Sequence, residues 1–352
     1  MATVTSPVSA FRFCRSMVVN ACAAALLAGC AGAGSLAAQP AGVMLSQARS
    51  AFDVEPGVAP LSHPVSAAAS RQRAWMAPDA KRRTLMYVSD ANDGTVSVLS
   101  YPGGQPVGTL TGFKEPYGLC TNAAGDVWIV DDQTATITEY AHGGTTPIAT
   151  LSDPGEYPAG CSVDAKTGNL AVTNYEASNR GQGSVAIYAG ASGTPAIYVD
   201  PSISRGWFCS YDNDGDLFVD GYADGSNGFQ LAELPYGEST FTNINVDQTI
   251  TVPGGVQWTG TYVAVADENG PGNGVVYQFS ISGSTGTRVT ATTFADSANI
   301  HQFWIDPAGK TIVVPSASLN TVGYWKFPGG KGPSKTIDGF NIPEAVAISK
   351  EK

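Results

Sequence analysis

Few of the residues from which hydrolytic and metal sites are usually built occur in this chain. Its 352 residues include three histidines, His63, His142 and His301, and six cysteines, none of which form a Cys-x-x-Cys pair. No Gly-x-Ser-x-Gly, His-Glu-x-x-His or phosphate-loop pattern is present. The sequence therefore offers no nucleophile elbow, no zinc-hydrolase helix and no nucleotide-binding loop.

Basic residues are scarce as well, with 19 Lys and Arg against 30 Asp and Glu and a formal net charge of −11. The first 83 residues contain 8 basic and 3 acidic residues, which leaves 11 basic and 27 acidic residues from Thr84 onward. Nucleic-acid binding draws most of its affinity from neutralised phosphates. We therefore expect no nucleic-acid partner.

The chain is rich in glycine, with 41 residues, many of them in a repeat of about 42 to 48 residues that occurs six times from Thr84 to Lys352. Each copy contains a short run of β-branched and aromatic residues bounded by turn formers, which predicts a strand. These runs are apolar on consecutive residues, so both faces of the strand should be buried. The predicted middle strands are 84–90, 126–131, 169–174, 216–220, 261–267 and 311–316.

An Asx-x-x-Gly turn precedes most of these strands, as in Asn122–Gly125, Asp164–Gly168, Asp212–Gly215 and Asp306–Gly309. Asx residues start such turns and glycine supplies the positive φ near their end. Upstream of the turn lies a predicted innermost strand, and Gly-rich hairpins follow further out. The predicted innermost strands are 118–120, 160–162, 207–210, 255–257 and 301–303.

The first copy lacks an innermost strand, and residues 342–348 at the other end of the chain supply one. We interpret this as ring closure, which protects strand edges that an open array would expose. The sequence thus predicts an all-β, six-bladed β-propeller over residues 84–352, with four antiparallel strands per blade. Coincidental β-meanders in two sandwiches are the alternative.

The motifs Pro116-x-Gly118, Asx-x-x-Gly and Val-x-Asp at strand ends resemble the NHL-type repeat of six-bladed, TolB-like propellers over residues 84–348. That superfamily includes lactonases, esterases, lyases and pure binding modules, so the resemblance implies a fold and not an activity.

The N-terminus carries an export signal. Arg12 and Arg15 precede an apolar stretch, 17–28, which is too short for a confident transmembrane helix. Leu27-Ala-Gly-Cys30 resembles the bacterial lipobox, which implies a signal peptide over 1–29, a lipid on Cys30 and a membrane anchor. An ordinary signal peptide is the alternative.

Residues 31 to about 74 are rich in Ala, Ser, Gly, Pro and Gln, and the Arg/Lys-rich junction that follows runs to 83. We expect the lipid-bearing segment 30–83 to be a disordered tether. Because Ala31, and not an acidic residue, follows Cys30, the lipoprotein sorting rule favours the outer membrane of a bacterial cell envelope.

Cys120, Cys161 and Cys209 lie on successive innermost strands. The turn alignment puts Cys161 and Cys209 in one register and Cys120 one residue out, so that it should face the other way. Export permits a disulfide, but neighbouring innermost strands can lie beyond the ~7 Å between Cα atoms that a bridge tolerates. We therefore favour buried apolar thiols over a bridge.

In propellers the loops before the innermost strands and after the middle strands open on one face, around the central channel. This places aromatic and charged residues at a common mouth, where His301 is the one imidazole, a weak candidate for a catalytic base. The candidate ligand-binding residues at the mouth are Tyr117, Tyr157, Arg205, Trp207, His301 and Glu344.

Carboxylates at the same mouth suit Ca²⁺, which takes six to eight oxygen ligands. In the gluconolactonase-like and paraoxonase-like relatives that the resemblance suggests, a channel metal polarises a lactone or ester. Capping of turns at blade corners is the other role for such residues. The candidate metal ligands are Glu115, Asp131, Asn174, Asp220 and Asp267.

The sequence therefore favours a lipid-anchored, monomeric propeller that acts as a binding or scaffold module for a glycan, peptide or envelope protein. A Ca²⁺-dependent lactonase or esterase is the alternative, and a purely structural envelope component is the third.

Overall fold

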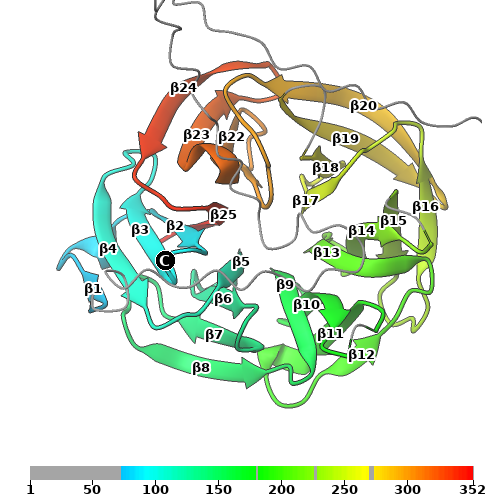
Figure 1. Cartoon of the computed structure of the whole chain (residues 1–352), viewed down its shortest axis with the longest axis horizontal. Coiled ribbons are helices and arrows are strands. Elements are labelled where there is room, and N and C mark those ends of the chain that lie inside the picture. The colour runs from blue at the N-terminus through cyan, green and yellow to red at the C-terminus, as the bar shows by residue number, and fades with distance from the viewer. Residues whose placement is uncertain (1–72, 180, 226–227, 269–272, 352) are drawn as a thin grey trace, which may run out of the picture. The chain divides into compact units, whose positions relative to one another are not determined.

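The computed structural model describes residues 73–351 except 180, 226–227 and 269–272. Its strands form six antiparallel blades arranged as a ring around a central channel (Figure 1), which confirms the predicted six-bladed propeller. The described residues contain three short 3₁₀ turns and no α-helix, and none of their helices is long and apolar enough to cross a bilayer. The predicted signal peptide, Cys30 and most of the tether lie outside the described residues.

Each blade is counted from its innermost strand outward. The first three blades are β25 (Pro343–Ser349), β2 (Leu85–Asp90), β3 (Thr95–Ser100), β4 (Pro106–Thr111); β5 (Pro116–Thr121), β6 (Val127–Asp131), β7 (Thr136–Tyr140), β8 (Pro147–Ser152); β9 (Glu156–Val163), β10 (Leu170–Ala177), β11 (Ser184–Tyr188), β12 (Ala196–Tyr198). The last three are β13 (Ile203–Tyr211), β14 (Leu217–Ala223), β15 (Phe229–Leu234), β16 (Thr242–Val246); β17 (Pro253–Trp258), β18 (Val263–Asp267), β19 (Gly274–Ser282), β20 (Thr285–Phe294); β21 (Trp304–Ile305), β22 (Thr311–Ser316), β23 (Thr321–Lys326), β24 (Gly330–Asp338).

The middle strands are buried on both faces, as their continuous apolar runs predict. In β6, Val127 and Ile129 join the apolar cluster shared with the first blade, whereas Trp128 and Val130 join the cluster shared with the third. A comparable cluster lies at each of the other blade interfaces. Stacking of adjacent blades therefore builds the core, and a single blade has none of its own.

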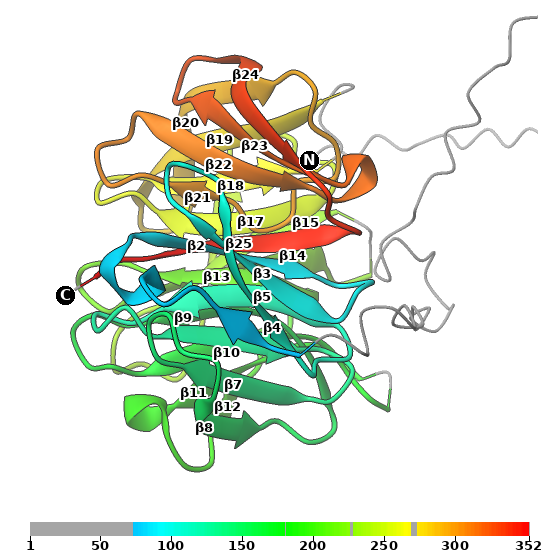
Figure 2. The ribbon, with the colours of Figure 1, turned by 90° about the vertical axis from the view of Figure 1, so that its left-hand side faces the viewer.

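The C-terminal strand closes the ring. β25 pairs antiparallel with β2, with Leu85 opposite Ser349, and the two strands lie side by side although they come from opposite ends of the chain (Figure 2). At the outer edge of the same blade, β1 (Trp75–Met76) pairs with β4. The sheet thus begins about ten residues before the predicted start at Thr84.

The predicted innermost strand at 301–303 is displaced. The sixth blade has β21 at Trp304–Ile305, and His301 lies in the loop before it. Gln302 instead bridges to Ala345 of β25 and exchanges side-chain hydrogen bonds with the backbone of Leu119, across the first blade. This contact takes the place of regular strand pairing at the channel wall.

The turn chemistry follows the sequence. Asn122 Oδ1 accepts from the backbone N–H of Ala124, and Asp212 Oδ1 accepts from that of Asp214. In the fifth blade, where the turn lacks an Asx residue, the Thr259 hydroxyl bonds to the backbone of Tyr262 instead. A hydroxyl therefore replaces the carboxylate in that turn.

One expectation about the cysteines is wrong. Cys120 and Cys161 form a disulfide between the second and third blades, with 5.7 Å between their Cα atoms, while Cys209 is free and buried. The innermost strands approach this closely because glycine lines their contact: a Cβ on Gly118 would lie 2.3 Å from the carbonyl oxygen of Ala159. The turn alignment was right about direction: Cys120 lies opposite Trp128 and Cys161 opposite Val172, and the two thiols face each other in the apolar cluster between the second and third blades.

Candidate binding site at the channel mouth

The loops before the innermost strands and after the middle strands meet at one end of the channel. His301, before β21, lies with Nδ1 3.2 Å from the hydroxyl of Tyr117, on β5, although 184 residues separate them. Glu344, on β25, contacts the same Nδ1, and Glu268 Oε2 lies 3.3 Å from Nε2. Three other segments of the ring thus place a polar side chain against one imidazole.

The imidazole is enclosed and charged. His301, Glu344 and Glu268 are each at most 2% exposed. Burial by itself would lower the pKa of His301, but the two carboxylates beside its ring nitrogens hold that pKa well above its ordinary value. A protonated imidazole cannot accept a proton, so this arrangement does not favour the role of catalytic base.

Aromatic rings surround the charged group. Trp207 packs edge-on against Tyr117 and His301, with ring centroids 6.0 Å apart in each case. The ring of Tyr175 lies closer, with its centroid 5.1 Å from that of Trp207. Its indole Nε1–H donates to Glu268 Oε1 at 3.1 Å. The rings are therefore fixed by edge contacts and a charge-assisted hydrogen bond, which makes a rigid aromatic floor.

Arg205 is held by the same rings. Its guanidinium lies 5.4 Å from the ring centre of Tyr175 and 5.9 Å from that of Tyr222. Tyr157 is half-buried and packs against the apolar cluster to which Trp207 belongs. The structure thus brings all six predicted mouth residues into one region.

Three members of this site were missed at the sequence level: Glu268, Tyr175 and Tyr222. Glu268 directly follows the strand-end residue Asp267, so a second acidic residue at that position was its one signal. Tyr175 and Tyr222 lie just beyond the predicted strands 169–174 and 216–220. They were missed because β10 and β14 extend past those bounds.

The strand-end carboxylates are largely committed to the backbone. Asp131 accepts from the N–H groups of Lys114 and Glu115 at 2.8 and 3.2 Å. Asp267 accepts from two N–H groups of the loop before β17, and Asp220 from one on β13. These residues clamp the mouth loops onto the blades, which is the turn-capping role that competes with metal binding.

The remaining predicted metal ligands do not complete a metal site. Asn174 donates through its side-chain amide to the hydroxyl of Ser184 at 3.0 Å. Among the described residues, no group of three or more His, Cys, Asp or Glu side chains is arranged to hold a metal ion. The calcium site stays a prediction without geometric support.

The mouth nevertheless brings together buried carboxyl groups that repel one another when they ionise. Burial raises the pKa of Asp90, Glu115 and Glu156 to about 7 in each case, and neighbouring carboxylates contribute to each shift. Asp132 is 1% exposed, and burial followed by the charges of Glu115, Asp131 and Glu176 raises its pKa well above the ordinary value. The mouth therefore favours cations.

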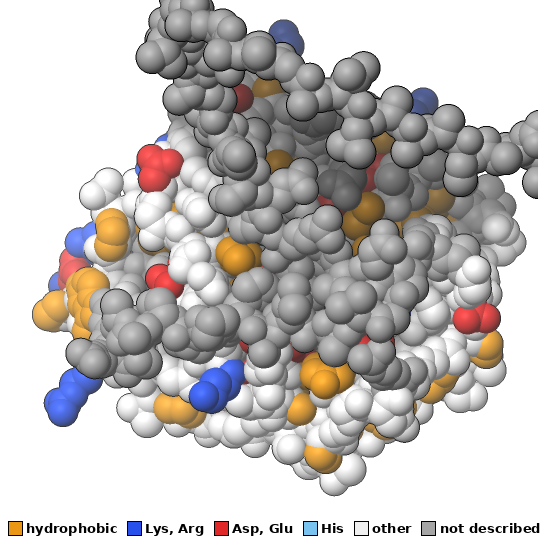
Figure 3. All heavy atoms as spheres, in the orientation of Figure 1, with side chains coloured by type: hydrophobic (Ala, Val, Ile, Leu, Met, Phe, Trp, Pro, Cys, Tyr) orange, Lys and Arg blue, Asp and Glu red, His pale blue; other side chains and the backbone are white. Residues whose placement is uncertain are grey.

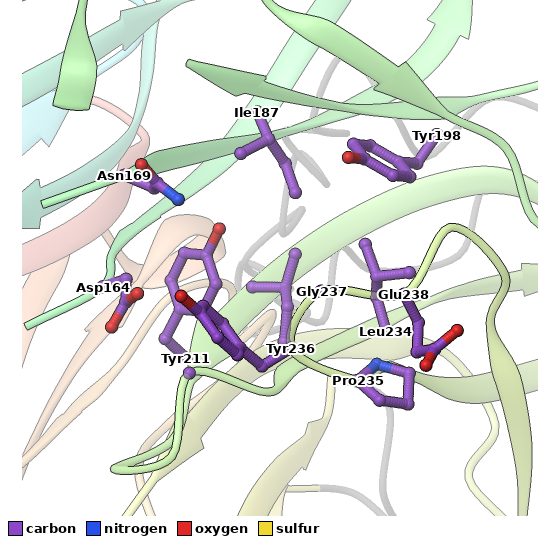
Figure 4. A pocket seen from close by; sticks show the side chains of 12 residues that line it. Asp164, Asn169, Ile187, Tyr198, Tyr211, Leu234, Pro235, Tyr236, Gly237 and Glu238 are labelled. Atoms are coloured by element: carbon purple, nitrogen blue, oxygen red, sulfur yellow. The ribbon is translucent and has the colours of Figure 1, made fainter. Parts of the chain in front are cut away.

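Two further hollows lie toward the opposite end of the blades. One, of about 270 Å³, is in the channel and is lined by Cys120, Cys161, Cys209 and Gln302, among others. The other, of about 220 Å³, lies between the third and fourth blades, where Ile187 and Tyr198 face Leu234 and Tyr236 (Figure 4). Where Figure 3 leaves the described residues in view, hydrophobic side chains appear at separate places on this face.

Comparison with known proteins shows the fold alone. No protein-family model and no curated sequence matches the chain. The structure is similar to a chain of a nidogen/laminin complex (TM-score 0.60, 12% identity, covering 76% of this chain and 99% of that one). It is also similar to a Bacteroides caccae protein of unknown function (0.58, 11%, 76% and 100%) and to Kuenenia stuttgartiensis hydrazine synthase (0.54, 13%, 77% and 80%).

Proposed function

We propose that this protein is an exported, lipid-anchored propeller that binds a peptide or protein partner at its channel mouth, in the bacterial cell envelope. The observation that carries the proposal is the partly exposed pair Tyr157 and Arg205, packed against a buried group of rings and charges that hold one another in place: Trp207, Tyr117, Tyr175, His301, Glu268 and Glu344. Rigid aromatics set among hydrogen-bonding charges are the residues that anchor protein interfaces.

A binding role suits this geometry better than catalysis. Both ring nitrogens of His301 face carboxylates, and the strand-end acids hold backbone N–H groups. The polar groups of the site are thus engaged in contacts with one another. These contacts hold the site rigid and so preorganise it for a ligand. One of the structurally similar chains belongs to a nidogen/laminin complex. A similar fold that takes part in a protein complex supports a protein partner here.

The envelope location rests on the Leu27-Ala-Gly-Cys30 pattern and on Ala31, which follows it. The disulfide between Cys120 and Cys161 suits an oxidising compartment. Mass spectrometry of the protein from a bacterial membrane fraction should find a lipid on Cys30. A Cys30→Ser variant should move to the soluble fraction, and membrane retention of that variant would contradict the anchor.

A glycan is the second candidate ligand, favoured by the pocket of Figure 4. Tyr198, Tyr211 and Tyr236 line it, and the Asn169 amide oxygen is fixed by the backbone N–H of Gly190, which leaves its NH₂ group as a donor. Tyrosine rings with an amide donor suit the apolar faces and hydroxyls of a sugar.

Binding to random-peptide and glycan arrays separates these candidates, with the full chain purified in detergent. Hits are then titrated by calorimetry against Tyr157→Ala and Arg205→Met at the mouth and Tyr236→Ala in the other pocket. Peptide affinity lost in the mouth variants alone supports the proposal. Sugar affinity lost only in Tyr236→Ala supports the glycan, and no specific binding in either array overturns both.

A further inference from the structure

One carboxylate at the mouth has no role in holding the fold. Asp132 follows β6, and its backbone N–H donates to the carbonyl of Glu115 at 3.1 Å. Its side chain is 1% exposed, yet neither carboxylate oxygen has a hydrogen-bond partner within the described part of the chain. The preceding Asp131 differs, because both of its oxygens accept backbone N–H groups.

Among the described residues, the charges that shift the pKa of Asp132 are of its own sign. Those that act on it are Glu115, in the loop before β5, Asp131, and Glu176 at the end of β10 in the next blade. The charge of Glu344 in turn raises the pKa of Glu115. Burying an ionised group without a partner costs free energy, and groups in such surroundings cluster at functional sites.

The carboxylate lies directly beneath the surface. Gln133 and Thr134, which follow it in the loop between β6 and β7, are exposed. The Gln133 side chain hydrogen-bonds to that of Glu115, a member of the cluster. The cluster is thus one side-chain hydrogen bond away from an exposed residue.

We propose that Asp132, with Glu115 and Glu176, forms a subsite for an organic cation, the ammonium or guanidinium group of a lysine or arginine side chain. This deepens the proposed function, on which it rests, by naming the anchor of the partner. An N–H donor group supplies both a positive charge and hydrogen bonds to the two oxygens of Asp132 that have none. A metal ion is the weaker candidate, because the described side chains form no metal-holding group.

Calorimetry on the full chain tests the subsite with defined probes: Nα-acetyl-lysine methylamide, Nα-acetyl-arginine methylamide, putrescine and CaCl₂. The variants are Asp132→Asn and, as a control that removes the same charge from an exposed position on a turn at the other end of the blades, Asp214→Asn. We expect saturable binding of at least one blocked amino acid, about tenfold weaker in Asp132→Asn and unchanged in Asp214→Asn.

Thermal melts at about pH 8 separate lost binding from lost folding. Asp132→Asn should melt no lower than the parent, because it removes a buried charge that lacks a partner. Equal affinity in parent and Asp132→Asn, or no saturable binding of any blocked amino acid, would overturn the subsite. Tighter binding of putrescine or of Ca²⁺ alone would overturn the assignment to a side chain.

The two proposals can fail separately. A peptide that loses affinity in Tyr157→Ala and Arg205→Met but not in Asp132→Asn would leave the mouth as the binding site and overturn only the cation subsite. Weaker binding in all three variants supports both.

Discussion

Replacing Glu115 by Gln should make the stability of the fold less dependent on pH. The Glu115 side chain is 2% exposed, and burial, followed by Glu344 and Asp131, raises its pKa from 4.5 to about 7, against a hydrogen bond from Gln133. The folded state therefore holds the proton more tightly than the unfolded state. Its contribution is fully present below the unfolded pKa and is lost as the pH rises through the folded pKa.

The size of the effect follows from the two pKa values. Their difference corresponds to about 3.4 kcal/mol in total, of which about 2 kcal/mol falls between pH 5.5 and pH 8.5. Lower pH is avoided because the sequence pI is ≈ 4.6, where proteins are least soluble. Glutamine has nearly the same shape and no charge to lose, so the variant should lack this part of the decline.

Urea unfolding of parent and Glu115→Gln, followed by tryptophan fluorescence at both pH values, measures the difference. Raised carboxylates on which Glu115 does not act, such as Asp90, contribute equally to both proteins and cancel. Glu238→Gln, an exposed position on the opposite face, is the control and should leave the pH dependence unchanged. The same loss of free energy in parent and Glu115→Gln would refute the reasoning.

Three further perturbations test the fold that holds the site. Replacing Cys120 and Cys161 together by Ser opens a loop whose ends are 41 residues apart, which should lower the free energy of unfolding by about 4 kcal/mol in urea titrations. Gly118→Ala drives a Cβ to 2.3 Å from the carbonyl oxygen of Ala159, so calorimetric melts should show a loss of about 1–3 kcal/mol. Deleting 343–352 removes β25 and exposes the edge of β2; size-exclusion chromatography should show aggregated or unfolded protein.

Each of these has a matched control or a contrary result. Gly332→Ala adds the same methyl where no atom lies within 4 Å, and should change stability little. A monomeric, equally stable truncated protein would contradict ring closure. Unchanged stability of the double Ser variant, with the disulfide verified in the parent, would contradict its structural role.

Much of the fold could be predicted because each blade repeats the same short apolar runs and turn residues. The apolar run 126–131 predicts a strand buried on both faces. In the structure, Val127 and Trp128 of β6 pack into different blade interfaces. The Asx turns could be predicted for the same reason, since Asn122 bonds to its own neighbours in the chain. Such features depend on contacts within a few residues.

The errors fall where contacts between blades decide the outcome. The turn alignment gave Cys120 and Cys161 opposite directions correctly, but the short distance between their strands comes from Gly118 against the backbone of Ala159 in the next blade, which no local pattern reports. Likewise, the bridge between Gln302 and Ala345 displaced the last innermost strand. Both contacts join segments far apart in sequence, so spacing within one repeat could not reveal them.

By itself, then, the sequence determined the number of blades, the closing strand and the face on which the mouth residues gather, because hydrophobic periodicity and turn chemistry act locally. Only the tertiary structure decided which contacts each of those residues makes. It bound Asp131 to the backbone, placed His301 between Glu268 and Glu344, and left Asp132 buried without a partner among the described residues. Hydrogen bonding and desolvation depend on distances between blades of a few ångströms, which no single repeat encodes.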